Sequence, residues 1–108
     1  MKVSFDFDHT LTNPKYFEIA KKFVALKADV YITTSRFSDS LGKKLPYDNR
    51  EVFKVAKELG IPSQKVRFTN GQDKYLFLKD FDMHFDDDEH ETTLINEHPS
   101  ICLGILIE

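Results

Sequence analysis

Four carboxylates stand at the ends of two short apolar segments of the chain. Asp6 and Asp8 follow residues 3–5, and Asp86 and Asp87 close the second segment. If the fold brings these groups together, they repel one another unless a divalent cation neutralises them. Mg²⁺ prefers hard oxygen donors and commonly takes one or two carboxylates with waters and phosphate oxygens. A carboxylate beside such a cation can act as a nucleophile on phosphorus, so we expect Mg²⁺-dependent phosphoryl chemistry.

Such chemistry also needs a hydroxyl and a cation that bind the charge of the transferred phosphoryl group. We predict Thr34 as the hydroxyl, with Thr33 and Ser35 as alternatives, because a shift of one residue turns a strand side chain to the opposite face. We predict Lys74, twelve residues before Asp86, as the cation. Its rival Lys65 precedes a predicted strand and is expected at the wrong end of the sheet.

These residues must be positioned by alternating strands and helices. Short β-branched or aromatic segments and a final apolar run predict five strands, at residues 3–7, 30–33, 66–69, 83–85 and 101–107. Asn13 and Pro14 are typical of a helix start, and apolar residues then recur at helical spacing up to residue 26. Asp48 with Glu51 resembles a capping box for a second helix that stops at Gly60. Two short helices are predicted near residues 73–78 and 92–97.

This order predicts a three-layer Rossmann-like α/β fold with a five-stranded parallel sheet and helices on both faces. In open parallel sheets, ligands bind outside the carboxyl ends of the strands. The carboxylates, the hydroxyl and the lysine are all predicted to follow strands at that edge. A length of 108 residues suits one domain, so we expect residues 1–108 to form a single catalytic domain.

Charge is divided unevenly along the chain. All fifteen Lys and Arg lie in residues 1–79, which carry +6, whereas residues 80–108 carry nine acids and no base. A cation bound by Asp86 and Asp87 explains only part of this acidity. Asp88, Glu89 and Glu91 are predicted to lie in a solvated loop.

The sequence contains neither a run of apolar residues long enough to span a membrane nor a secretory signal segment. Its single cysteine, Cys102, lies in an apolar run and is predicted to be a buried thiol. We therefore expect a soluble cytoplasmic protein that does not associate with membranes.

Four motifs resemble those of the haloacid dehalogenase-like (HAD) superfamily of phosphohydrolases. Residues 6–12 (DFDHTLT) resemble its DxDxT motif, and residues 32–36 (ITTSR) resemble its second motif, a strand that ends in Thr or Ser. Lys74 is similar in placement to the third-motif lysine, and residues 83–87 (MHFDD) resemble the fourth motif. The four occur in the order of the family, on predicted strands where the family has them.

The resemblance implies a role for each matched residue. Asp6 corresponds to the nucleophile that is phosphorylated, and Asp8 to the general acid that protonates the leaving group and then activates water. Mg²⁺ is then held by Asp6, by the backbone carbonyl of Asp8 and by Asp86. Asp87 is either a further metal ligand or an orienter of Lys74. The second aspartate of the DxDxT motif favours a phosphatase over a dehalogenase.

Substrate selection in the superfamily depends largely on cap insertions, for which this sequence has no room between its motifs. We expect an open site that accepts a large phosphorylated substrate such as a macromolecular phosphoester, or a small one when a homo-oligomer shields the site. Thr10, Ser35 and three cations of the loop at residues 36–46 are assigned to substrate binding. The three cations are Arg36, Lys43 and Lys44. His9 is either a donor to substrate or a backbone residue of the first motif's loop.

Three other functions fit parts of the sequence. A nucleic-acid-binding module is suggested by the +6 of residues 1–79, although these cations are spread over helix surfaces without an aromatic stacking pattern. A receiver-type phosphoacceptor domain shares the parallel fold, but it requires an aspartate after the third strand, where Asn70 and Gly71 stand. A catalytically weak phosphate-binding relative of the superfamily is the third.

Overall fold

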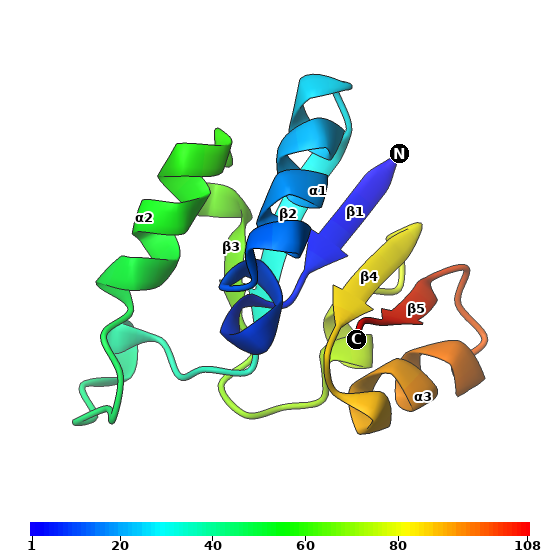
Figure 1. Ribbon diagram of the computed structural model, residues 1–108. Helices are drawn as coiled ribbons and strands as arrows, with labels where there is room; N and C mark the ends of the chain where they lie inside the picture. Colours follow the sequence, from blue (N-terminus) through cyan, green and yellow to red (C-terminus); the bar gives the residue numbers. More distant parts are fainter.

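A computed structural model describes all residues 1–108 of the chain and confirms the α/β fold. Five parallel strands form one sheet in the order β3-β2-β1-β4-β5 (Figure 1). The strands are β1 (Lys2–Phe5), β2 (Asp29–Thr34), β3 (Val66–Phe68), β4 (Met83–Asp86) and β5 (Leu103–Leu106). The α-helices are α1 (Pro14–Ala25), α2 (Arg50–Leu59) and α3 (Glu89–Glu97). Shorter helical turns span Phe7–Leu11, Asp39–Leu41, Ser63–Lys65 and Lys74–Phe77.

Strand order reverses between the two central strands. From β1 the chain moves outward through β2 to β3, and it then returns to place β4 on the other side of β1. Val3 pairs with Met83 and Phe5 with Phe85, so β1 and β4 end side by side. Such a reversal point is where open α/β sheets bind ligands. Asp6 and Asp86 stand at the carboxyl ends of these two strands.

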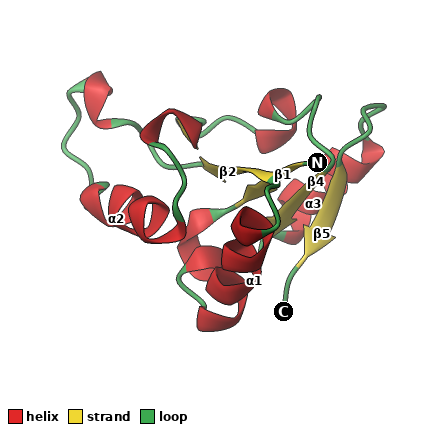
Figure 2. Cartoon of the chain, turned by 90° about the horizontal axis from the view of Figure 1, so that it is seen from above, coloured by secondary structure: helices red, strands yellow, loops and turns green.

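The helices cover the sheet on both faces, with α1 and α2 together on one side (Figure 2). Phe5 and Phe85 stack there with ring centroids 4.7 Å apart, and Phe23 of α1 packs edge-on against Phe5. This main core has twelve buried residues: Val3, Phe5, Phe7, Leu11, Ala20, Val30, Ile32, Val52, Ala56, Leu59, Ile61 and Val66.

A smaller apolar cluster lies on the opposite face under α3. It consists of Leu78, Phe81, Ile95 and Cys102, which confirms the predicted burial of the cysteine. Gly104 of β5 lets α3 approach the sheet closely: a Cβ at that position would lie 2.9 Å from the carbonyl oxygen of Thr92. The opposite face therefore combines a small apolar cluster with a tight helix contact.

Local signals set most helix ends. The Asn13 side chain accepts from Lys15 N at the start of α1, and Gly60 ends α2 in the left-handed conformation (φ 79°). The predicted capping box of α2 is wrong. Asp48 accepts from the backbone N–H of Arg50, but Glu51 pairs with the Arg36 guanidinium instead of reaching back.

Helix α3 begins three residues earlier than predicted. The Asp88 carboxylate caps it by accepting from the backbone N–H groups of His90 and Glu91. Asp88, predicted as loop, is therefore a helix cap.

Candidate functional site

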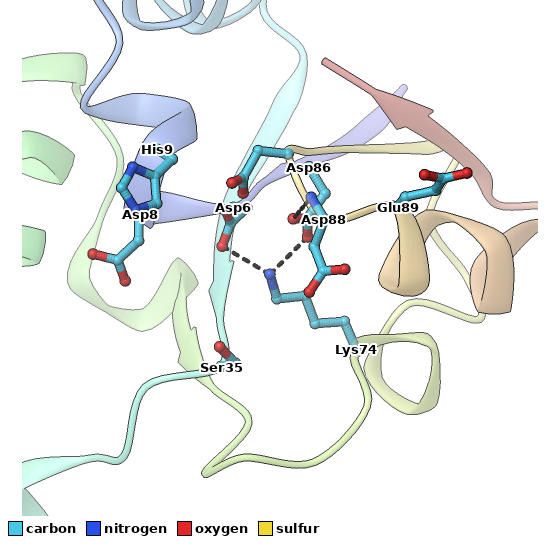
Figure 3. Close-up of a pocket in the computed structure, with 9 residues that line it drawn as sticks. Asp6, Asp8, His9, Ser35, Lys74, Asp86, Asp88 and Glu89 are labelled. Atoms are coloured by element: carbon cyan, nitrogen blue, oxygen red, sulfur yellow. Dashed lines mark hydrogen bonds and ion pairs between the residues drawn. The ribbon is translucent and has the colours of Figure 1, made fainter. Parts of the chain in front are cut away.

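A cavity of about 450 Å³ opens at the carboxyl ends of β1 and β4. Its nine lining residues are all polar: Asp6, Asp8, His9, Ser35, Lys74, Asp86, Asp87, Asp88 and Glu89 (Figure 3). Six of them are carboxylic acids and only one is a lysine. Such a surface attracts cations and repels a free phosphate ester, unless a cation is bound first.

Lys74 joins the two central strands through their carboxylates. Its Nζ donates to Asp6 Oδ1 at 2.7 Å and to Asp86 Oδ2 at 2.6 Å (Figure 3). Burial opposes the ammonium charge, but the two carboxylates outweigh burial and raise the pKa of Lys74. The backbone N–H of Lys74 donates to Glu91, so this glutamate anchors the segment that carries the lysine. Glu91 was predicted to lie in a solvated loop, and it is instead nearly buried.

Asp6 is almost enclosed at the end of β1. Burial raises the pKa of its carboxyl group, while Lys74 opposes this shift. The Thr10 hydroxyl donates to Asp6 Oδ2 at 3.1 Å. Thr10 was assigned to substrate binding, but it is fully buried outside the cavity wall and contacts Asp6.

Asp86 is held by three donors. Lys74 and His84 Nε2, 2.8 Å away, share its Oδ2, and the backbone N–H of Asp88 donates to its Oδ1 at 3.0 Å. Burial raises the pKa of Asp86, but His84 and Lys74 outweigh burial and lower it to about 2. These donors therefore favour the ionised form of Asp86.

A row of buried polar side chains continues from Asp86 across the face opposite α1. His84 Nδ1 lies 2.9 Å from Ser4 Oγ, and the Ser4 and Thr33 hydroxyls are 2.7 Å apart. All three side chains are fully buried, and desolvation lowers the pKa of His84. Neutral imidazole carries one N–H, and Asp86 can only accept, so that N–H belongs on Nε2.

The spacing of polar residues along two strands is a sequence signal for this row. Ser4 lies two residues before Asp6, and His84 lies two residues before Asp86, so each pair shares one face of its strand. Polar residues at such positions interrupt strands that are otherwise apolar.

Three carboxylates are placed to hold a cation. Asp6, Asp86 and Asp87 each offer one oxygen, and these oxygens all lie within 4.8 Å of one another. Lys74 balances only one of the three negative charges. An oxygen-only donor set of this kind fits a hard divalent cation such as Mg²⁺. The Asp8 side chain does not belong to this set.

Asp8 instead pairs with Arg36 through two hydrogen bonds. Arg36 Nε lies 2.9 Å from Asp8 Oδ2, and Nη2 lies 2.7 Å from Asp8 Oδ1. These hydrogen bonds lower the pKa of Asp8. Arg36 was assigned to substrate, but it is buried between the Phe7 and Tyr47 rings and does not line the cavity. Its planar donors are already satisfied by carboxylates within the chain.

The hydroxyl that reaches the cavity is that of Ser35. Thr34 is fully buried, and its Oγ1 accepts from the backbone N–H of Arg36 at 3.3 Å. The structure thus places the alternative Ser35, and not the preferred Thr34, in the cavity wall.

The remaining lysines lie apart from the site. Lys43 and Lys44 are exposed and do not line the cavity; Lys43 Nζ lies 4.7 Å from the ring centroid of Phe37. Lys65 pairs with Asp29 at the start of β2, which confirms its expected place at the opposite end of the sheet.

None of the helices combines the length and the apolar character needed to cross a membrane. A scan against protein-family models finds no match to this sequence, and a search of curated proteins also finds none. What the chain can do is therefore inferred from the cavity residues and their chemistry.

Proposed function

We propose that the protein is a Mg²⁺-dependent phosphatase of the HAD-like superfamily that hydrolyses a phosphate monoester through an aspartyl-phosphate on Asp6. The observation that supports this most is the bridge of Lys74 between Asp6 and Asp86, with Asp87 in reach of the same cation. This arrangement places a buried carboxylate, a fixed ammonium group and three carboxylates that could hold a cation at the point where the strand order reverses.

In the first half of the proposed reaction, an Asp6 carboxylate oxygen forms a bond to phosphorus while the bond to the leaving oxygen breaks. Lys74 keeps Asp6 in place and balances part of the charge on the phosphoryl group. Asp8 gives its proton to the leaving oxygen. The bound cation supplies the positive charge that lets a phosphate enter a cavity with six carboxylates.

In the second half, a water oxygen attacks phosphorus, the bond to Asp6 breaks, and Asp8 takes the proton from water. The paired Arg36 favours the ionised form of Asp8, which suits this step. The acid role in the first half requires that Asp8 is protonated when substrate binds. An anionic phosphate beside Asp8 favours that protonation, because a nearby like charge raises a carboxyl pKa.

The strand order argues against a receiver-type domain. Receiver domains of the flavodoxin-like type have the order 2-1-3-4-5, whereas this sheet has the order 3-2-1-4-5.

Hydrolysis of para-nitrophenyl phosphate tests the proposal, with Mg²⁺ or with EDTA. We expect Asp6→Asn to lower kcat by a factor of about 10³ or more, which corresponds to about 4 kcal/mol of barrier. Asp80→Asn is the matched control, because Asp80 is exposed and pairs with Lys2 at the far end of β1. Equal rates for wild type and Asp6→Asn would rule out Asp6 as nucleophile.

A further inference from the structure

His9 has a backbone conformation that side chains other than glycine rarely adopt. Its φ is 62°, in the left-handed region. Only two other non-glycine residues share it, Lys27 (φ 68°) and Asn70 (φ 56°). Asn70 is well suited to such a position, and its side-chain oxygen accepts from Ser38 N. Histidine also adopts this region more often than most side chains, but it still carries a conformational cost there that glycine does not.

The His9 side chain contributes little to the fold. It is exposed, and its ring makes no hydrogen bond within the chain. Only its backbone N–H is used, donating to Thr12 Oγ1 at 3.1 Å, which any residue other than proline could do. Glycine would therefore satisfy the same loop with less strain.

What the His9 side chain does is line the cavity. His9 and Asp8 stand on one side of it, and Asp88 and Glu89 stand on the other (Figure 3). Carboxylates in this cavity offer mainly acceptors, and Lys74 is engaged by two of them. His9 and Ser35 are thus the cavity side chains whose hydrogen-bond donors are available to a ligand.

We propose that His9 donates a hydrogen bond to the leaving group of the substrate and so selects phosphate esters whose alcohol carries further oxygen atoms. This inference rests on the proposed phosphatase function. In that function the phosphoryl group lies between Asp6 and the cation, and the leaving oxygen faces Asp8. His9 is the next residue along the chain and lines the same wall, so its ring is on the leaving-group side.

The rest of the cavity agrees with this preference. None of its nine lining residues is hydrophobic, so a flat apolar leaving group finds no surface to pack against. A polyol phosphate instead presents hydroxyl oxygens that can accept from the His9 imidazole. We therefore expect glycerol 3-phosphate to bind more tightly than phenyl phosphate.

The test compares His9→Gly, His9→Gln and Lys27→Gly with wild type. Glycerol 3-phosphate and phenyl phosphate are the two substrates, and Tm, kcat and KM are measured with Mg²⁺. Lys27→Gly is the matched control, since it removes a side chain from the same backbone conformation at the end of α1, away from the cavity. Both glycine variants should keep or gain thermal stability, because the left-handed strain is relieved.

We expect His9→Gly to raise KM for glycerol 3-phosphate roughly 3- to 10-fold, the range for loss of one hydrogen bond. KM for phenyl phosphate should stay within about twofold of wild type. His9→Gln, which keeps a donor, should recover part of the loss, and Lys27→Gly should change neither KM.

Two results would overturn the inference. One is an unchanged KM for glycerol 3-phosphate in His9→Gly. The other is an equal rise for both esters, which would place the contact on the phosphate and not on the leaving group. If wild type hydrolyses neither of these esters nor para-nitrophenyl phosphate, the proposed phosphatase function itself fails. If it hydrolyses para-nitrophenyl phosphate or phenyl phosphate but not glycerol 3-phosphate, the leaving-group preference alone is wrong.

Discussion

Substitution of Lys74 by methionine removes the charge that separates two buried carboxylates while keeping a side chain of similar length. The carboxylate oxygens of Asp6 and Asp86 that could share a cation lie within 4.8 Å of each other. At an effective dielectric constant of about 20, two unit charges at that distance repel by about 3.5 kcal/mol. Removal of one partner from a buried ion pair typically costs about 3–5 kcal/mol. We therefore expect Lys74→Met to lower the free energy of unfolding by about 3–4 kcal/mol.

Urea denaturation in EDTA at neutral pH measures this loss. Lys79→Met is the matched control, because Lys79 is an exposed lysine five residues along the chain, and its effect should stay within about 0.5 kcal/mol. Excess Mg²⁺ should restore part of the stability of Lys74→Met, since a bound cation replaces the missing positive charge. A loss below about 1 kcal/mol would refute the view that Lys74 holds the carboxylates together.

The loss in free energy of unfolding caused by Lys74→Met should also depend on pH, and the titration of Asp6 decides the direction of this dependence. Burial raises the pKa of Asp6, and loss of Lys74 removes the strongest opposing interaction. A folded state that binds a proton more readily than the unfolded state loses stability as the pH rises through the folded pKa. The loss of stability in Lys74→Met should therefore shrink as the pH falls from neutral through the raised pKa of Asp6. A deficit that stays constant over this range would contradict the raised pKa.

Two further changes separate the metal site from the packing of the sheet. His84→Leu should weaken Mg²⁺ binding about 10- to 100-fold in calorimetric titrations, because Asp86 loses a donor that orients it. His84→Gln, which retains a donor, should recover much of that affinity, and equal affinity in wild type and His84→Leu would show that the imidazole does not position Asp86. Gly104→Ala would place a Cβ 2.9 Å from the Thr92 carbonyl oxygen, so we expect a loss of about 1–3 kcal/mol in urea denaturation. Its Mg²⁺ affinity should stay unchanged, and an unchanged urea midpoint would show that α3 moves aside freely.

The fold could be predicted because its signals are local. Alternating apolar patterns, Asn13 before α1 and Gly60 after α2 each act within a few residues. The parallel sheet then follows from the order of the elements. The same order placed Lys74 and the carboxylates at one edge, and the structure brings Asp6, Lys74 and Asp86 into contact there.

The errors arise where long-range contacts compete with local ones. Glu51 was expected to close a capping box, but the guanidinium of Arg36 recruits it from another segment. Arg36 in turn was expected at substrate, yet Asp8, 28 residues earlier, occupies its donors. Which hydroxyl reaches the cavity depends on where β2 ends, and an error of one residue exchanges Thr34 for Ser35.

The pairing of β1 with β4 has a consequence for how the chain acquires its site. Asp6 and Asp86 are neighbours in space although they lie 80 residues apart, so neither half of the chain alone can form the cation-binding set. During synthesis Asp6 is made early. It gains Asp86 and Asp87 as neighbours only after β4 has been made and has paired with β1. Contacts of such high sequence separation form late and slowly. If the proposed Mg²⁺ binds there, it would stabilise only chains whose sheet is assembled, and cation binding would report the completion of folding.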